Sequence, residues 1–359
     1  RARQILRPDI DTAMSMGGWL TGVESRLLQL SNDQIRASRR MAGNPRTIVR
    51  GKAGTGKTII AIERAKQLAE EGKSVLFVCF NQLLADHVRS SLNSRGVAID
   101  VFHAHKLYRM VIVAAGMAET LKQKEDQEDF YERIFPEIFL DAAVSSETKS
   151  YDAIVVDEAQ DLLTVPHLDA LDVLLAKGLN KGAWHIFFDP MQNIYNQEIQ
   201  EAVMDRLSEG QPAFDDLFEN CRNTRQIAVQ TSILSGIDMA IEGAPDGPEA
   251  ELIYYKAGGC LELLEWTLRE LLVDGIRCAD IVILSPVRQE NSFLAGVRKL
   301  AGVEITDVDT LSRTHFFSRR CTALRVLNEK WFWHWIWSVL AARAWLKFTM
   351  QGFPAPLPC

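Results

Sequence analysis

The feature that most constrains the fold is a glycine-rich run between a predicted strand and a predicted helix. Residues 51–58 read Gly-Lys-Ala-Gly-Thr-Gly-Lys-Thr and match the pattern GxxxxGK[ST] in full. Residues 47–50 predict the strand before it, and residues 57–71 predict a helix that Gly72 ends. Glycines let backbone N–H groups face a triphosphate, and the N-terminus of a helix adds partial positive charge. The run therefore predicts a P-loop nucleotide-binding domain of the α/β class.

The same run supplies the candidate ATP-binding residues. In such loops the lysine, here Lys57, reaches the β- and γ-phosphate oxygens, and the following hydroxyl, here Thr58, holds Mg²⁺. The candidates from the loop are Gly51, Ala53, Gly54, Thr55, Gly56, Lys57 and Thr58. The predicted cofactors are accordingly ATP and Mg²⁺.

An acidic run, Asp157-Glu158-Ala159-Gln160-Asp161, comes directly after the apolar residues 153–156. A carboxylate at the carboxyl end of a buried strand is well placed to bind Mg²⁺ through water, which makes Asp157 a metal candidate beside Thr58. Glu158 is placed to orient or deprotonate an attacking water and is the candidate catalytic base. Alone this run is only an acidic loop, but downstream of a P-loop it indicates nucleotide hydrolysis.

The order of predicted elements indicates a parallel sheet flanked by helices. Short apolar runs alternate with helical segments, which is typical of α/β folds with right-handed crossovers. The predicted strands cover residues 47–50, 74–79, 99–102, 153–156 and 185–188. We therefore expect a P-loop NTPase with a RecA-like sheet.

Changes in composition predict where the domains begin and end. A helical lead-in is expected at 1–29, with a break at Gly17-Gly18, before a RecA-like ATP-binding core at 30–242. The polar, acidic stretch at about 105–148 predicts a helical insertion in that core. The turn-rich residues 243–248 predict a boundary, followed by a partial second RecA-like domain at 250–313 and an atypical Trp-rich tail at 314–359.

Composition excludes several classes of protein. With 47% hydrophobic and 24% charged residues, the chain is neither disordered nor a disulfide scaffold. Six cysteines lie far apart without a CxxC pair, so we expect a reducing, cytoplasmic location. The net charge of −7 is uneven, because residues 1–60 hold eleven Lys and Arg against four Asp and Glu. This basic excess is either ordinary solvated surface or a patch that meets a phosphate backbone.

The tail has a composition unlike the rest of the chain. Five of the eight tryptophans lie in residues 314–359, and four of them alternate at 331, 333, 335 and 337. The longest charge-free apolar run is too short to span a membrane, so no membrane partner is expected. The segment is either an interfacial or partner-binding element or an artefact of the sequence, such as a frame change after Arg313.

Several further motifs resemble those of superfamily 1 helicases of the UvrD/Rep/PcrA type, for which the DEAQD wording of the acidic run is typical. Residues 30–37 resemble the Q motif, 78–85 motif Ia, 101–103 the element that follows it, 188–195 motif III and 217–224 motif IV. The resemblance covers residues 30 to about 313. The wording Asn-Cys-Arg-Asn-Thr at 220–224 is closest to helicases that often follow a nuclease-related domain.

The resemblance implies roles for single residues in these motifs. It implies that Gln34 recognises adenine, that Gln192 senses the γ-phosphate and that Arg222 is an arginine finger. The implied catalytic residues are therefore Glu158, Gln192 and Arg222. The residues implied to contact DNA are Asn81, His103 and Tyr195, the last by stacking on a base.

The chain also departs from the family pattern. Cys221 stands where the family commonly has a tyrosine that stacks on adenine, and Asn196-Gln197 replace the Trp-Arg that often follows motif III. Residues 309–313 resemble the opening of motif V, but its usual continuation and motif VI are missing. The family residues for adenine stacking, for one base platform and for completing the ATP site are therefore not present at these positions.

The resemblance implies an ATP-dependent DNA helicase or translocase acting on single-stranded DNA or on a junction between single and double strands. One alternative is a truncated, motor-dead nucleotide-binding protein that serves as an interaction module. Another is a P-loop ATPase that does not bind nucleic acid, against which Gln192 and Tyr195 argue.

Overall fold

The structure of the chain is a computed structural model. It describes residues 16–39, 43–93, 99–190, 197–236, 238–253, 258–284, 291–307, 324–327 and 347–348. The chain divides into two compact units, one of residues 28–244 and one of residues 1–27 with 245–359. We describe each unit by itself.

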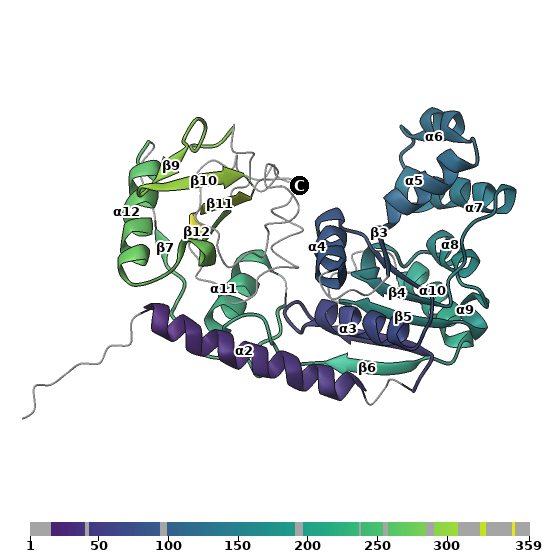
Figure 1. Cartoon of the computed structure of the whole chain (residues 1–359), viewed down its shortest axis with the longest axis horizontal. Coiled ribbons are helices and arrows are strands. Elements are labelled where there is room, and N and C mark those ends of the chain that lie inside the picture. Colours follow the sequence, from purple (N-terminus) through teal and green to yellow (C-terminus); the bar gives the residue numbers. More distant parts are fainter. Residues whose placement is uncertain are drawn as a thin grey trace, which may run out of the picture. The chain divides into compact units, whose positions relative to one another are not determined.

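The unit of residues 28–244 is built on a six-stranded parallel sheet (Figure 1). Its strands are β1 (Arg46–Gly51), β2 (Val75–Cys79), β3 (Asp100–His103), β4 (Ala153–Asp157), β5 (Ala183–Phe188) and β6 (Ala213–Leu217). Their order in the sheet is β3-β2-β4-β5-β1-β6, so β5 lies between the strand that leads into the P-loop and the strand that ends in Asp157. The predicted RecA-like α/β fold is confirmed.

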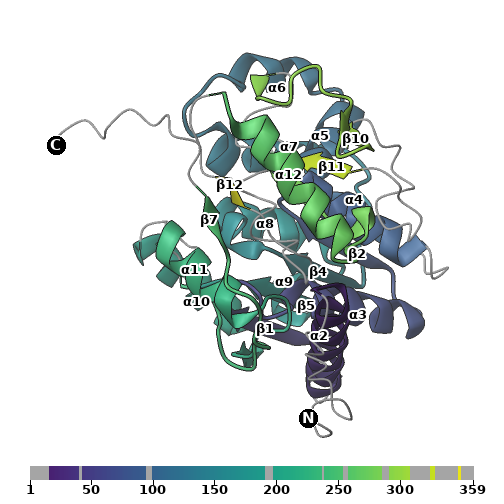
Figure 2. The ribbon, with the colours of Figure 1, turned by 90° about the vertical axis from the view of Figure 1, so that its left-hand side faces the viewer.

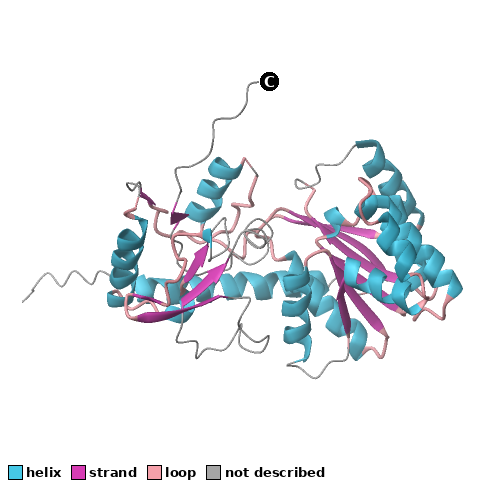
Figure 3. Ribbon diagram, turned by 90° about the horizontal axis from the view of Figure 1, so that it is seen from above, coloured by secondary structure: helices cyan, strands magenta, loops and turns pink. Residues whose placement is uncertain are grey.

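Helices cover both faces of this sheet (Figure 3), and two apolar cores lie beneath them. Alternate residues of a strand point to opposite faces, and here Ile48 and Ile154 belong to one core while Val49 and Val155 belong to the other. Helices α3 (Lys57–Glu70) and α4 (Gln82–Asn93) supply the second core. Helices α8 (Val165–Leu174), α9 (Gly178–Lys181) and α10 (Gln197–Glu209) supply the first. The unit also contains η3 (Ala159–Asp161) and α11 (Arg225–Ser235).

A group of helices separates β3 from β4, in the stretch predicted as a helical insertion. It contains α5 (Ala104–Ala114), α6 (Ala118–Lys124), the π-helical turn η2 (Phe130–Ile134) and α7 (Phe135–Ser145). Its interior is aromatic, with Tyr108, Phe130, Phe135 and Phe139 all buried. These helices extend the core of one sheet face beyond β3 and β4.

The second unit carries smaller sheets and the helix α12 (Cys260–Val273), seen in Figure 2. One sheet has the order β8-β11-β10-β9, with β8, β11 and β10 parallel and β9 antiparallel. The strands are β8 (Val282–Leu284), β9 (Lys299–Leu300), β10 (Val303–Asp307) and β11 (Leu324–Leu327), and the pair β7 (Leu252–Ile253) and β12 (Lys347–Phe348) forms a second sheet. The short helix η4 (Cys278–Asp280) leads into β8. Leu264 and Leu268 of α12 pack against Ile281, Ile283 and Leu300 in the core of this unit.

Helix α2 (Met16–Ser38) corrects one sequence prediction. Gly17 and Gly18 predicted a break, but both lie in the first turn of this helix, where glycine interrupts little. Among the described residues, no helix has the length and apolar character needed to cross a bilayer. Motif V at 309–313 and the alternating tryptophans at 331–337 lie outside the described residues.

Candidate functional site

The candidate site lies where the strands of the six-stranded sheet end. All six strands are parallel, so the segments that follow them meet at one edge, the usual place for ligands in such folds. The P-loop follows β1, Asp157 ends β4, and Asp189 follows β5 between them. Residues far apart in the sequence are thereby brought together.

The P-loop has the backbone conformation that its glycines predict. Gly54 and Gly56 have φ values of 94° and 80°, which residues with a Cβ atom rarely adopt. The Lys57 ammonium is buried and donates hydrogen bonds to the carbonyl oxygens of Gly51 (2.8 Å) and Lys52 (3.3 Å). Its Nζ lies 3.9 Å from Oδ2 of the fully buried Asp189. Lys57 is therefore held inside the loop, at the amino end of α3.

Asp157 presents two buried acceptor atoms without hydrogen-bond partners. Within the part of the chain that the structure describes, neither carboxylate oxygen meets a donor with hydrogen-bond geometry, although the residue is completely buried. Burial and the neighbouring charge of Glu158 raise the pKa of Asp157 to about 7, opposed by Thr58 and Lys57. Such orphaned oxygens match a divalent cation, which prefers oxygen ligands and stabilises the ionised carboxylate. Asp157 and Thr58 fit the predicted Mg²⁺.

Asp157 and Thr58 suit a cation that is bound jointly by the protein and by the phosphates of a nucleotide. Among the described residues there is no cluster of three or more His, Cys, Asp or Glu side chains able to hold a metal alone. Mg²⁺ is commonly bound by one or two carboxylates, water and substrate phosphates, and it does not need such a cage. Thr58 of α3 and Asp157 of β4 are the residues that would supply the protein's ligands to such a cation.

Glu158 has a strained backbone and a fixed side chain. Its φ of 50° lies in the left-handed region, where a non-glycine residue is uncommon and often marks a functional site. The amide Nε2 of Gln160 donates to Oε2 of Glu158 over 2.6 Å, and the backbone N–H of Asp189 donates to Oε1 of Gln160 over 3.2 Å. Gln160 thus connects the ends of β4 and β5 and orients Glu158.

Gln34, the predicted adenine contact, lies against the P-loop. A Cβ atom on Gly56 would come within 2.8 Å of Oε1 of Gln34 and 2.6 Å of Sγ of Cys221, so only glycine fits there. Nε2 of Gln34 donates to the carbonyl oxygen of Glu219 over 2.9 Å, while its Oε1 is buried without a partner. Helix α2, the P-loop and residues 219–221 meet at this point.

The segment that follows β6 contacts the P-loop through Asn220 and Cys221. The backbone N–H of Cys221 donates to the carbonyl oxygen of Gly54 over 3.1 Å. Oδ1 of Asn220 accepts from the backbone N–H groups of Arg222 and Asn223, both over 2.9 Å, and its Nδ2 donates to the carbonyl oxygen of Ala240. This turn buries Arg222, the predicted arginine finger, which is 9% exposed. Arg222 is near enough to His87 of α4 that its charge contributes to lowering the pKa of that imidazole.

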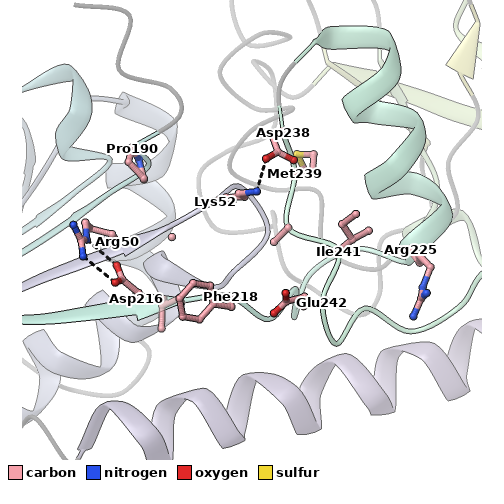
Figure 4. A pocket seen from close by; sticks show the side chains of 13 residues that line it. Arg50, Lys52, Pro190, Asp216, Phe218, Arg225, Asp238, Met239, Ile241 and Glu242 are labelled. Atoms are coloured by element: carbon pink, nitrogen blue, oxygen red, sulfur yellow. Dashed lines mark hydrogen bonds and ion pairs between the residues drawn. The ribbon is translucent and has the colours of Figure 1, made fainter. Parts of the chain in front are cut away.

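A pocket of about 580 Å³ opens beside the start of the P-loop (Figure 4). Two ion pairs line it, a bidentate one between Arg50 and Asp216 (2.7 and 2.8 Å) and one between Lys52 and Asp238. The other lining residues are Gly51, Pro190, Leu217, Phe218, Arg225, Met239, Ala240, Ile241 and Glu242. Of the predicted ATP-binding residues, Gly51 lines this pocket, whereas neither Lys57 nor Asp157 does.

The residues implied to contact DNA are placed unevenly. Oδ1 of Asn81 accepts from the backbone N–H of Leu84 over 3.3 Å and so caps the first turn of α4. His103 ends β3, half-buried, where burial and the charge of Lys106 lower the pKa of its imidazole. Gln192 and Tyr195 lie outside the described residues. The structure brings Asn81 and His103 to the same sheet edge as the P-loop.

Sequence reasoning missed three residues of the site: Gln160, Asp189 and Asn220. Each one stands inside a quoted motif, so its position was visible, but its partner was not. Gln160 and Asp189 act across neighbouring strands, and Asn220 acts on the chain that follows it. The strand order is the missing information.

Comparison with known proteins gives one family. The family described as Schlafen group 3, DNA/RNA helicase domain, matches residues 46–233. That segment contains the P-loop, the acidic run and the turn at Asn220. None of the curated proteins matches the chain.

Similar solved structures share little sequence with the chain. Bacteroides Pif1 bound to ssDNA is 15% identical, with 59% of this chain and 46% of that chain covered and a TM-score of 0.28. FlaH from Methanocaldococcus jannaschii is 14% identical (47% and 73% covered, TM-score 0.26), and the E. coli DExH-box NTPase HrpB is 12% identical (84% and 34%, TM-score 0.36). The chain thus spans less than half the length of the Pif1 and HrpB chains.

Proposed function

Because the chain belongs to the Schlafen group 3 DNA/RNA helicase domain family, we propose that it couples ATP hydrolysis to movement along single-stranded DNA. The finer assignment is a superfamily 1 helicase or translocase related to the UvrD/Rep/PcrA type. One observation carries the proposal: Lys57, Thr58, Asp157 and Glu158 converge at the carboxyl edge of one parallel sheet, with the oxygens of Asp157 unpartnered.

The chemistry proposed for this edge is attack of water on the γ-phosphorus, with cleavage of its bond to the β,γ-bridging oxygen. Lys57 exchanges its loop carbonyl contacts for phosphate oxygens, and Glu158 accepts the proton of the attacking water. Gln160 holds the Glu158 carboxylate in place through the 2.6 Å hydrogen bond. When bound through Thr58 and Asp157, Mg²⁺ would neutralise charge on the phosphates.

Two further residues would complete recognition and catalysis. Gln34 has a buried acceptor oxygen beside Gly56, which suits the amino group of adenine. Arg222 would stabilise charge that develops on the γ-phosphate, an effect worth several kcal/mol in other enzymes. Gln192, as sensor of the γ-phosphate, and Tyr195, as a base contact, remain part of the proposal.

The partner is a single strand, or a junction between single and double strands, contacted by Asn81 and His103 at the same edge of the sheet. ATP hydrolysis and strand binding would then communicate through helices that begin at this edge. Hydrolysis that depends on the strand distinguishes this function from that of a P-loop ATPase that ignores nucleic acid.

Steady-state ATP hydrolysis tests the proposal directly. The whole chain is assayed with and without a single-stranded DNA oligonucleotide, next to Lys57→Ala and the matched control Lys66→Ala, a partly exposed lysine on the same helix that pairs with Glu63 and Glu70. We expect DNA to stimulate the wild type, Lys66→Ala to match it, and Lys57→Ala to lose activity by on the order of 10²–10³. Tight ATP binding without turnover, or a rate indifferent to DNA, would contradict the proposal.

A further inference from the structure

A row of aromatic rings leads from the end of β2 into the helical insertion. Phe80 follows β2 and meets His105, the second residue of α5, edge to face with ring centroids 5.1 Å apart. His105 in turn stacks on Tyr131 of η2, at 4.7 Å and 27° between the ring planes. Phe135 lies behind both rings, 5.6 Å from His105 and 6.3 Å from Tyr131. We call Phe80, His105 and Tyr131 the aromatic ledge.

The ledge lies at the sheet edge proposed to meet the strand. Phe80 directly precedes Asn81, and the ring of His105 is 6.2 Å from that of His103. Asn81 and His103 are the two described residues implied to contact nucleic acid. The aromatic ledge therefore extends from Asn81 and His103 into the helical insertion.

Its outer member is accessible and its middle member has an unused polar atom. Tyr131 is 50% exposed, unlike the other aromatic residues of this cluster, Tyr108, Phe130, Phe135 and Phe139, which are buried. Nε2 of His105 is buried and has no hydrogen-bond partner among the residues that the structure describes. Burial and the charges of His103 and Arg109 lower the pKa of His105 to about 4, so the ring is neutral at pH 7.

One cation next to the ledge, Lys106, suits a phosphate group, whereas the turn that carries Tyr131 is acidic, with Glu128 and Glu132 exposed. Lys106 is exposed, and its ammonium forms no ion pair with any carboxylate in the part of the chain that the structure describes. It lies near enough to His103 for its charge to contribute to lowering the pKa of that imidazole. An aromatic ring for the base beside a cation for the phosphate is the usual composition of a single-strand site.

We propose that the aromatic ledge binds an unpaired nucleobase, which stacks on the exposed ring of Tyr131 while Lys106 contacts the adjoining phosphate. The inference rests on the proposed function, since it extends the strand site implied by Asn81 and His103. Stacking on a ring tolerates any base, so the site would bind without sequence preference. Its ligand is single-stranded nucleic acid, and DNA and RNA are separate arms of the test.

The experiment uses oligonucleotides with one 2-aminopurine, whose fluorescence is quenched by stacking, and anisotropy to measure affinity. The whole chain is titrated without nucleotide as wild type, Tyr131→Leu, Tyr131→Phe and the matched control Met110→Ala, an exposed apolar residue of α5. Leucine keeps the apolar contacts with Phe130 and Phe135 but removes the ring. Thermal unfolding verifies that each variant is folded.

We expect Tyr131→Leu to weaken single-strand binding roughly tenfold and to abolish the added quenching, while Tyr131→Phe and Met110→Ala behave as wild type. Equal losses with DNA and RNA would support recognition of the base, and a loss with one of them alone would identify the ligand. Wild-type affinity and quenching in Tyr131→Leu would overturn the ledge and leave the proposed function standing. A wild type that binds neither single strand would overturn the proposed function itself.

Discussion

The two ends of the six-stranded sheet differ in whether their buried polar groups have hydrogen-bond partners. At the amino end, the side chains of Thr47, His185 and Arg64 are hydrogen-bonded to one another through both nitrogens of His185. Oγ1 of Thr47 lies 2.7 Å from Nδ1 of His185, and Nε of Arg64 donates to Nε2 of His185 over 3.1 Å. At the carboxyl end, both oxygens of Asp157 and Oε1 of Gln34 have no hydrogen-bond partner. One sheet thus holds a satisfied polar cluster and an unsatisfied one.

This difference distinguishes buried polar groups that stabilise the fold from buried polar groups that are available to bind a ligand. An unpaired buried polar atom costs about 1–3 kcal/mol, and native proteins keep few of them. On the proposed function, those at the carboxyl end would gain partners from a nucleotide and a cation, whereas the amino-end cluster needs none. Changes at the two ends should therefore affect activity and stability in opposite proportions.

Glu158→Gln is expected to have the largest effect, confined to activity. The amide oxygen can still accept the hydrogen bond from Gln160, so the geometry and ATP binding should persist while the base is lost. We expect hydrolysis to fall by about 10²–10⁴, the usual contribution of general base catalysis. Single-turnover hydrolysis and binding of a fluorescent ATP analogue measure the two effects. Loss of nucleotide binding would refute the role of base.

His185→Leu is expected to affect stability alone. Since Arg64 donates to Nε2, the neutral ring carries its proton on Nδ1 and donates it to Thr47; the substitution leaves the buried guanidinium with one acceptor fewer. We expect the free energy of unfolding, measured with urea, to fall by about 2–4 kcal/mol. The kcat for ATP hydrolysis should be unchanged at temperatures where the variant is folded. Thr47→Val, which removes only a hydroxyl, should cost less. A reduced kcat with normal stability would erase the distinction between the two ends.

The fold was predictable where local patterns are strong. The five predicted strands are buried apolar runs beside motifs, and all five are confirmed. β6 was missed because its sequence, Ala-Phe-Asp-Asp-Leu, lies at a sheet edge, where Phe214 and Asp216 remain exposed. An edge strand gains only part of its stability from burial, so its sequence carries little of the signal.

The site was predictable as a set of residues but not as an arrangement. The P-loop and acidic run identify Lys57 and Glu158 because phosphate binding and hydrolysis need those groups at fixed spacing. Nothing in the sequence states that β5 lies between β1 and β4, and hence that Asp189 faces Lys57 and holds Gln160. The roles of Gln34 and Arg222 came from the resemblance and stay predictions.

Asp157→Asn is expected to stabilise the nucleotide-free protein while reducing hydrolysis. The pKa of Asp157 is about 7 in the folded chain against 3.8 when exposed, so between these values the folded state retains a proton that the unfolded state has released. Stability should fall as pH rises through this range, and the full penalty should be present above pH 7. The variant lacks that penalty, so we expect a gain of about 1–3 kcal/mol at pH 8 and a smaller one at pH 5.

The matched control for that experiment is Asp152→Asn. The pKa of Asp152 is lowered by hydrogen bonds from the hydroxyl and backbone N–H of Ser74, so its carboxylate contributes stability above its ordinary pKa. The substitution should therefore destabilise the protein at pH 8, the opposite sign. Urea unfolding at pH 5 and pH 8 without nucleotide measures both variants. If the free energy of unfolding depended on pH equally in Asp157→Asn and the wild type, Asp157 would not be an unpaired, destabilising charge at the carboxyl end of the sheet.

Gln34→Ala is expected to have the smallest effect, and it tests whether the unpartnered Oε1 is reserved for adenine. If Oε1 accepts from the amino group of the base, its loss removes one hydrogen bond, and KM for ATP should rise about five- to tenfold, or roughly 1 kcal/mol. KM for GTP, whose base presents a carbonyl at that position, should stay constant, so the preference for ATP falls. Asp33→Ala, a half-exposed change on the same helix, is the control. Equal increases for ATP and GTP would mean that Gln34 supports the P-loop through Glu219 and does not recognise the base.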